Sequence, residues 1–250
     1  MIQAPTQPLA SAANQAAILP EAAAGGGDVL WSDYATLQWD VSVDAADPMI
    51  DLIEGADANP SSTTYRAAPT SHPTLNNRWF SSSGRFETVT ELQETRFDTD
   101  AALIMSYVSL QEYTATRQIQ RRSTTTQIAC TLASDETTIT VWNGNRFAVF
   151  PLGFNPAVTT WRTLAYISTP DSIRYWHEGV EITPSSEDYT GSAASTGFSS
   201  PLGGSAGSSR VSLGEIIFFD KTVVDDGNAP GAILSAHDYL QAKWIDTDGT

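Results

Sequence analysis

Residues 137–150 have the sequence TTITVWNGNRFAVF. Polar and apolar residues alternate on both sides of Asn143-Gly144-Asn145, so each half presents one apolar face, as a half-buried β-strand does. Asn and Gly tolerate a positive φ, and the tripeptide therefore predicts a type I′ turn. We expect a β hairpin whose strands are Thr137 to Trp142 and Phe147 to Phe150.

Similar runs continue from Asp28 towards the C-terminus, rich in Val, Ile, Thr and aromatic residues and separated by Gly, Pro, Asn, Asp and Ser. Such runs are typical of an all-β chain. The most apolar run, Val211 to Phe219, is expected at the centre of a sheet. Ser185 to Ser209 is rich in Ser and Gly and is expected to form a long loop, with a short irregular strand near Phe198 as the alternative. The other expected strands are Thr36 to Val43, Ala102 to Leu110, Thr125 to Leu132, Trp161 to Ser168, Ile173 to His177 and Val180 to Thr183.

One helix is expected, near the C-terminus. Ala229-Pro230-Gly231 opens it, and apolar residues from Ile233 to Trp244 then recur at helical spacing. The helix should pack on the outside or edge of the strands. The expected fold class is all-β: a two-sheet antiparallel jelly-roll sandwich with one short C-terminal helix and an extended N-terminal arm.

The first 27 residues differ from the rest. They are mostly Ala, Gln, Pro and Gly and end in Gly25-Gly26-Gly27, a hinge composition that builds no core of its own. Two interpretations stay open: a flexible tail, or an extended arm that orders on a neighbouring subunit through residues such as Ile18 and Leu19. We expect the folded domain to span residues 28–250.

The net charge and the cysteine content argue against several classes of function. The 250 residues contain 13 Lys and Arg against 29 Asp and Glu, a net charge of −16, which argues against binding nucleic acid or an anionic membrane. Cys130 is the single cysteine, so no intramolecular disulfide forms. The sequence begins without a signal-peptide pattern and has no apolar run of membrane-spanning length. We expect assembly in a cytoplasm and no membrane partner.

Three stretches carry a resemblance to a known family. Trp161 to Ile167 followed by Ile173 to Ile182 is similar to paired strands that end in a "Y-V-N-G" hairpin, with His177 where Asn is frequent. Leu213 to Asp220 is similar to a closing "G-x-I-x-E-x-x-x-Y" strand, and Tyr239 to Trp244 to a "Y-L-x-x-K-W" helix. Together they resemble the concanavalin A-like lectin/glucanase (laminin-G-like) jelly roll, especially the versions in tailed-bacteriophage structural proteins.

The resemblance implies a non-enzymatic virion protein, such as a capsid decoration, head-fibre or tail subunit on the virion surface. It would act through contacts with other virion proteins and form a homo-oligomer, most plausibly a trimer. The alternative is a carbohydrate-binding adhesion module that recognises a host-surface glycan. Fold alone does not decide between these functions.

The sequence does not predict an enzyme. The glucanase signature E-x-D-x-x-E is absent, and Glu178 and Glu181 flank a turn and would not share a face. Residues 203–207 match G-x-S-x-G, but they lie in a loop rather than between a strand and a helix, so Asp220 and His237 complete no triad.

No cofactor is expected. The three histidines, His72, His177 and His237, do not stand at metal-ligand spacing. Asp225-Asp226-Gly227-Asn228 and Asp246-x-Asp248-Gly249 have the oxygen-rich composition of calcium loops but lack the Glu that completes an EF-hand. We expect acidic turns there, with calcium as the alternative.

Two groups of residues are candidates for binding. Aromatic faces stack on the apolar faces of sugars, but alternating strands place large aromatic side chains in cores by default. An arginine cluster on an expected edge strand, Gln111 to Gln127, would pair within the chain or contact an acidic neighbouring subunit. The aromatic candidates for a glycan or subunit contact are Trp142, Trp161, Tyr175 and Trp176, and the arginines are Arg117, Arg121 and Arg122.

Overall fold

The computed structural model describes the chain in thirteen segments. Expectations for the N-terminal arm and for His72, Arg121, Arg122, Phe198 and Asp248 lie outside them. The segments are residues 29–40, 58–60, 65–66, 78–80, 85–88, 101–109, 117–120, 128–132, 137–152, 161–195, 202–203, 211–219 and 222–246.

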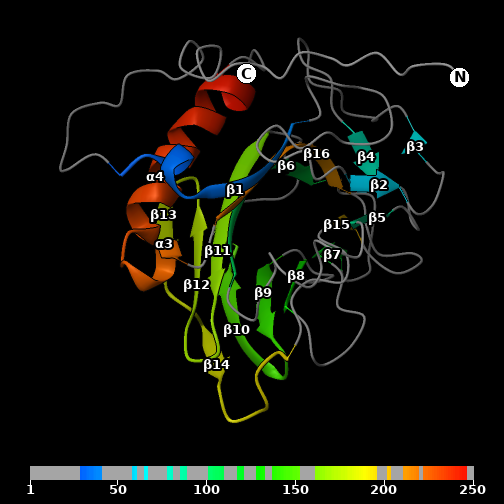
Figure 1. Cartoon of the computed structure of the whole chain (residues 1–250). Coiled ribbons are helices and arrows are strands. Elements are labelled where there is room, and N and C mark those ends of the chain that lie inside the picture. The colour runs from blue at the N-terminus through cyan, green and yellow to red at the C-terminus, as the bar shows by residue number, and fades with distance from the viewer. Residues whose placement is uncertain are drawn as a thin grey trace, which may run out of the picture.

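Within these segments the strands form two main antiparallel sheets and a small third one (Figure 1). The eight-stranded sheet has the order β13-β12-β11-β6-β16-β4-β3, with β1 also paired to β16: β1 (Ala35–Asp40), β3 (Tyr65–Arg66), β4 (Arg78–Phe80), β6 (Ala101–Ser109), β11 (Arg162–Ser168), β12 (Ile173–His177), β13 (Val180–Ile182) and β16 (Val211–Phe219). The five-stranded sheet has the order β14-β10-β9-β8-β7: β7 (Arg117–Gln120), β8 (Ile128–Leu132), β9 (Thr138–Asn143), β10 (Arg146–Pro151) and β14 (Ser186–Asp188). The third sheet contains β2 (Ala58–Pro60), β5 (Arg85–Thr88) and β15 (Leu202–Gly203).

This arrangement confirms the expected all-β sandwich. The predicted central strand, β16, pairs with β6 along one edge and with β1 and β4 along the other. The stretch expected to be one long loop instead contributes the short strands β14 and β15. That expectation was wrong because the stretch pairs with distant strands although it lacks an alternating pattern of its own.

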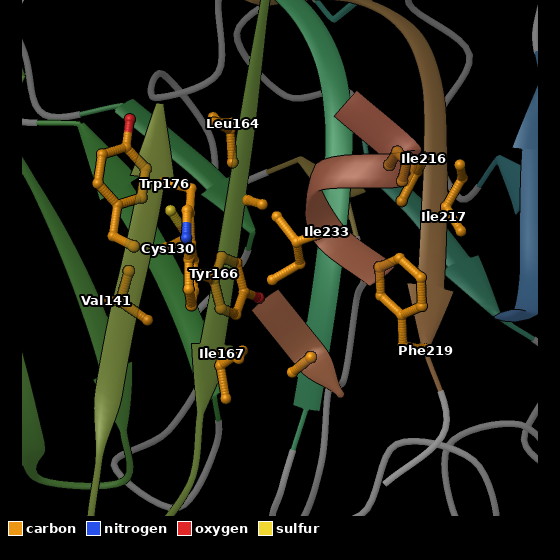
Figure 2. Close-up of a cluster of buried hydrophobic side chains, with 14 of the residues drawn as sticks. Cys130, Val141, Leu164, Tyr166, Ile167, Trp176, Ile216, Ile217, Phe219 and Ile233 are labelled. Atoms are coloured by element: carbon orange, nitrogen blue, oxygen red, sulfur yellow. The ribbon is translucent and has the colours of Figure 1, made fainter. Parts of the chain in front are cut away.

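The core between the two main sheets is built by alternation. From the five-stranded sheet Ile139, Val141 and Phe150 are fully buried, and Phe150 packs on Tyr175 of β12 with ring centroids 5.3 Å apart. Cys130 and Tyr166 lie in the same buried cluster (Figure 2). Burial raises the pKa of the Cys130 thiol, so this cysteine is a neutral core residue.

A helical layer covers the other face of the eight-stranded sheet. The helix α4 (Ala229–Leu240) packs against β6 and β11 and is followed by one π-helical turn, η2 (Gln241–Ile245). Trp244 of η2 stacks on Trp161 at 5.1 Å. As a result every residue of β11 after Arg162 is buried. The short elements η1 (Trp31–Asp33) and α3 (Thr222–Asp225) flank α4.

A buried polar network ties this layer to the sheet. The carboxylate of Glu215, which has no exposed surface, accepts hydrogen bonds from Lys243 Nζ at 2.8 Å and Trp244 Nε1 at 3.1 Å. Its other oxygen accepts one from Gln38 Nε2 at 2.5 Å, and the Tyr239 hydroxyl lies 3.3 Å from Lys243 Nζ. The strand motif around Glu215 and the helix motif from Tyr239 to Trp244 therefore contact each other directly.

Two hairpin turns differ from expectation. In the β9–β10 turn Gly144 has φ 67° and Asn145 does not share a positive φ, the pattern of a type II′ turn rather than the predicted type I′. In the β12–β13 turn Glu178 (φ 48°) and Gly179 (φ 73°) are both positive. Glu178, rather than His177, therefore occupies the left-handed position that Asn tolerates well.

Candidate functional site

The face of the five-stranded sheet that points away from the core carries the candidate site. Along β9, Ile139, Val141 and Asn143 are buried while the intervening residues are partly exposed. The same alternation along β10 leaves Phe147 and Val149 partly exposed. This outer face therefore holds a mixture of hydroxyl and apolar side chains.

Two aromatic side chains of the outer face form a cross-strand pair. Trp142 of β9 and Phe147 of β10 are register partners, their ring centroids lie 4.9 Å apart, and their planes make an angle of 47°. Both are half-buried. Because of this tilt the two rings do not form one flat surface, and we call the inclined pair the aromatic cradle.

A carboxylate continues the same row. Asp188 of β14 is the register partner of Phe147, so it shares the outer face with the aromatic pair. Its Oδ1 accepts hydrogen bonds from the Thr190 hydroxyl at 2.6 Å and the Thr190 backbone N–H at 2.8 Å. These bonds lower the pKa of Asp188, so it is ionised at neutral pH. We call Asp188, Phe147 and Trp142 the outer-face row.

The outer-face row combines the two groups that bind sugars. An aromatic ring stacks on the apolar C–H face of a sugar ring. A carboxylate accepts hydrogen bonds from sugar hydroxyls, and such charge-assisted bonds are the stronger kind. Adjacent strands lie about 4.8 Å apart, so the three side chains span a width comparable to one or two sugar rings.

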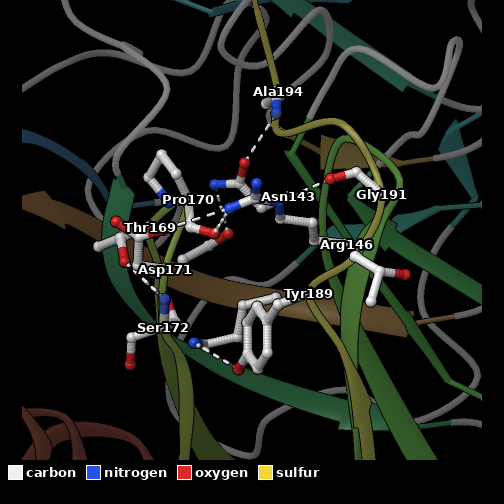
Figure 3. Close-up of polar contacts among 12 residues, drawn as sticks. Asn143, Arg146, Thr169, Pro170, Asp171, Ser172, Tyr189, Gly191 and Ala194 are labelled. Carbon is white, nitrogen blue, oxygen red and sulfur yellow. Dashed lines mark hydrogen bonds and ion pairs between the residues drawn. The ribbon is translucent and has the colours of Figure 1, made fainter.

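Arg146 fixes the loops beside the row (Figure 3). Its Nε donates a hydrogen bond to the Gly191 carbonyl at 2.8 Å, and its Nη1 bonds the Pro170 carbonyl. The same Nη1 lies 3.3 Å from Asp171, a carboxylate exposed enough that the ion pair adds little stability. Arg146 thus joins the loop after β11 and the loop after β14 to the β9–β10 hairpin.

Asn143 forms buried hydrogen bonds at the same end of the sandwich. Its buried amide donates to Ser168 Oγ at 3.2 Å and accepts from the Ala194 backbone N–H at 2.8 Å. Asn145, across the turn, donates to Ser192 Oγ at 3.0 Å. Hydrogen bonds of Asn143 and Asn145 therefore tie the β9–β10 turn next to Trp142 to two segments, the end of β11 at Ser168 and the loop at Ser192 to Ala194.

Three of the four predicted aromatic binding residues are core residues. Trp161, Tyr175 and Trp176 are 2%, 0% and 4% exposed. Their rings pack on Trp244, on Phe150 and beneath the Arg174 guanidinium. Trp161 is covered by Trp244 of the helical layer and Tyr175 by Phe150 of the five-stranded sheet, so both rings lie within the core. Of the four, Trp142 alone is only half-buried.

The predicted polar candidates occupy separate places. Arg117 begins β7, which is the edge strand of the five-stranded sheet as expected. Glu178 pairs with Arg162 at 2.9 Å, whereas Glu181 forms two hydrogen bonds with Arg174, which lower the pKa of Glu181. The two glutamates therefore belong to different ion pairs.

Asn228, at the end of the acidic stretch before α4, is engaged within the fold, whereas Asp225 and Asp226 are exposed. Asn228 donates its side-chain N–H to the Tyr34 hydroxyl, and its carbonyl accepts the Ala232 N–H. Throughout the part of the chain that the structure describes, no three His, Cys, Asp or Glu side chains gather closely enough to hold a metal ion. Among the same residues no helix has both the length and the hydropathy to cross a membrane.

Two buried histidines lie where the β12–β13 hairpin meets α4. His237 Nδ1 and Thr163 Oγ1 are 2.6 Å apart, and the His237 ring packs on Gly179. Burial, assisted by the nearby charges of Arg162 and His237, lowers the pKa of His177 to about 4, against the opposing effect of Glu178. Burial also lowers the pKa of His237. Both rings are neutral at pH 7.

Neither a protein-family model nor a curated protein sequence matches this chain. Solved structures do. Trypanosoma rangeli sialidase in complex with 2,3-difluorosialic acid matches with a TM-score of 0.58 at 10% identity, over 93% of this chain and 36% of the sialidase chain. The botulinum neurotoxin serotype D binding domain matches with a TM-score of 0.55 at 10% identity, over 82% of this chain and 51% of that one.

A structure of botulinum neurotoxin type C matches with a TM-score of 0.51 at 12% identity, over 81% of this chain and 51% of that one. The chain thus spans between about a third and a half of these structures. At such identities the likeness shows the fold alone. The class that the fold defines is an all-β, jelly-roll-like sandwich.

Proposed function

We propose that this protein is a carbohydrate-binding module and that the outer-face row is its sugar-binding surface. The observation that carries the proposal is the half-buried Trp142 and Phe147 pair with the ionised Asp188 beside it in register. A sugar ring would stack on Trp142 while Asp188 accepts hydrogen bonds from its hydroxyls.

Similar folds in carbohydrate-recognising proteins support this proposal over the virion role expected from the sequence. One matching Trypanosoma rangeli sialidase structure holds sialic acid, and botulinum neurotoxin type C interacts with two ganglioside molecules. The proposed module binds its glycan without cleaving it. The predicted trimer and virion location remain predictions of the family resemblance.

The proposal is tested by binding of the purified full chain to a glycan array, followed by calorimetric titration of the best glycan. We expect saturable binding with a Kd on the order of 1 mM for a single sugar unit. Trp142→Ala should weaken binding at least about tenfold, which corresponds to about 1.4 kcal/mol. Trp142→Leu keeps apolar bulk without a ring face and should show a similar loss.

The matched control is Leu234→Ala. Leu234 is 50% exposed on α4, in the layer opposite the outer face, so its truncation removes exposed apolar surface without touching the row. Its affinity should equal that of the wild type. Binding that survives both Trp142 variants, or no binding to any glycan by the folded protein, would overturn the proposal.

A further inference from the structure

We propose that the outer-face row takes a single uncharged hexose ring in preference to sugars that carry a carboxylate. This inference rests on the proposed function and names its ligand class. It separates the chain from the matching sialidase structure that holds sialic acid.

The charge beside the aromatic cradle is negative. Asp188 adjoins the cradle in register, and its hydrogen bonds to Thr190 favour the ionised form. Glu187 precedes it in β14, and the whole chain carries a net charge of −16. An anionic sugar stacked on Trp142 would therefore bring its carboxylate close to another carboxylate.

The one cation of the three strands that form the row is already engaged. Arg146 is the only Lys or Arg within the described strands β9, β10 and β14. Its guanidinium binds the carbonyls of Gly191 and Pro170 and lies near Asp171. Its register partner is the buried Asn143, so Arg146 belongs to the inward-facing set of β10 and not to the set of Phe147. It is not placed to neutralise a carboxylate on the outer face.

The shape of the cradle selects one ring. Flat, insoluble polysaccharides present a plane, which requires coplanar aromatic rings to stack on it. Trp142 and Phe147 are inclined at 47° to each other, so a plane can lie flat on one ring only. A single soluble sugar ring fits this angle because one ring stacks on it while the other flanks its edge.

The experiment measures binding of several probes to the purified full chain. The probes are lactose, 3′-sialyllactose, insoluble cellulose and the methyl glycosides of glucose, galactose, mannose and N-acetylglucosamine. We expect at least one neutral probe to bind and 3′-sialyllactose to bind roughly three- to tenfold more weakly than that probe, the size of a like-charge repulsion across several ångströms in a water-like dielectric. The difference should shrink at about 1 M salt, where the screening length is about 3 Å.

Asp188→Asn tests the cause of the discrimination. The Asn side-chain oxygen still accepts the two Thr190 hydrogen bonds, so the variant removes charge and little else. Affinity for the neutral sugar should fall severalfold while affinity for 3′-sialyllactose holds or rises, so their ratio approaches one. The matched control is Glu187→Gln, which makes the same change in net charge at the neighbouring position, whose register partner is the buried Ala148. Its ratio should remain that of the wild type.

The outcomes separate the two proposals. Binding of 3′-sialyllactose as tight as that of the neutral probes, binding to cellulose alone, or equal loss of discrimination in both variants overturns the ligand class and leaves a carbohydrate-binding module. Absence of binding to every probe and to the glycan array overturns the proposed function itself.

Discussion

The buried carboxylate of Glu215 lies 2.8 Å from Nζ of Lys243, and this ion pair joins the central strand β16 to η2. Glu215 has no exposed surface, so taking it out of water is costly unless every oxygen is hydrogen-bonded. Trp244 and Gln38 supply the remaining donors. The buried charge of Glu215 is therefore compensated by residues of η2 that pack on the sheet.

Loss of one partner of this pair should be strongly destabilising. Lys243→Met should lower the free energy of unfolding by about 3 kcal/mol or more, because Glu215 would remain buried and partly unpaired. In the double variant Glu215→Leu with Lys243→Met, the total loss should be smaller than the sum of the single losses by about 1 to 3 kcal/mol. Urea unfolding monitored by tryptophan fluorescence measures both. Simple additivity would mean that the two side chains do not interact.

Gly144 and Gly227 have similar positive φ values but different surroundings. A Cβ at Gly144 (φ 67°) would lie 2.5 Å from the Ala193 carbonyl carbon, whereas a Cβ at Gly227 (φ 71°) meets nothing within 4 Å. Gly227→Ala should cost only the left-handed strain, about 1 kcal/mol. Gly144→Ala should cost more than about 2 kcal/mol because backbone must also move. Equal midpoints in urea would contradict the close approach.

Acid should destabilise the protein through its buried histidines. Burial holds the folded-state pKa of His177 at about 4 and also lowers that of His237, so the unfolded chain binds more protons between about pH 6.5 and 4. The contribution of the neutral histidines to the free energy of unfolding is fully present above about pH 6.5 and decreases as the pH drops through that window. Between pH 7 and 4.5, the free energy of unfolding of His177→Gln should fall by about 1 to 3 kcal/mol less than that of the wild type.

Urea midpoints at several pH values test this dependence. Val180→Ala, a truncation of a 62% exposed side chain on the same hairpin, is the control and should keep the full acid sensitivity. If the His177→Gln curve runs parallel to that of the wild type, the histidine is not the group responsible.

Arg146 should control the local opening of the loops beside the row. Arg146→Met removes its bonds to Gly191 and Pro170, so the Ala194 and Asn145 amides, which bond Asn143 and Ser192, should exchange hydrogen roughly tenfold faster. Arg174→Met, which breaks a partly exposed ion pair on another strand, should leave those two amides unchanged. If the two amides exchange hydrogen in Arg146→Met at the wild-type rate, Arg146 does not control the opening of these loops.

Local pattern predicted the strands well. The β9–β10 hairpin was placed within about a residue because its alternation and turn residues are contiguous, and β16 was placed centrally because it is apolar on both faces. The turn type was wrong, because Asn143 is used as a buried hydrogen-bonding residue and the two-residue loop starts at Gly144.

The site was harder to predict because its parts come from distant strands. Trp142 was named as a candidate, but β14 lies in a Ser- and Gly-rich stretch with no alternating signal, so the position of Asp188 beside Phe147 could not be expected. Alternation also does not reveal a third layer. The helical layer that covers the second face of the eight-stranded sheet makes Trp161 a core residue, packed on Trp244.

The most direct test of the central claim is the chemical shift of the Trp142 indole N–H during titration with the neutral sugar that binds best, its signal assigned by comparison with Trp142→Phe. Trp142 is half-buried beside Phe147, whereas the rings of Trp161, Trp176 and Trp244 are buried. The Trp142 signal should move saturably with the calorimetric Kd while those of Trp161, Trp176 and Trp244 stay in place. A sugar that binds with the same Kd and leaves the Trp142 signal unmoved would place the binding surface elsewhere and contradict the account.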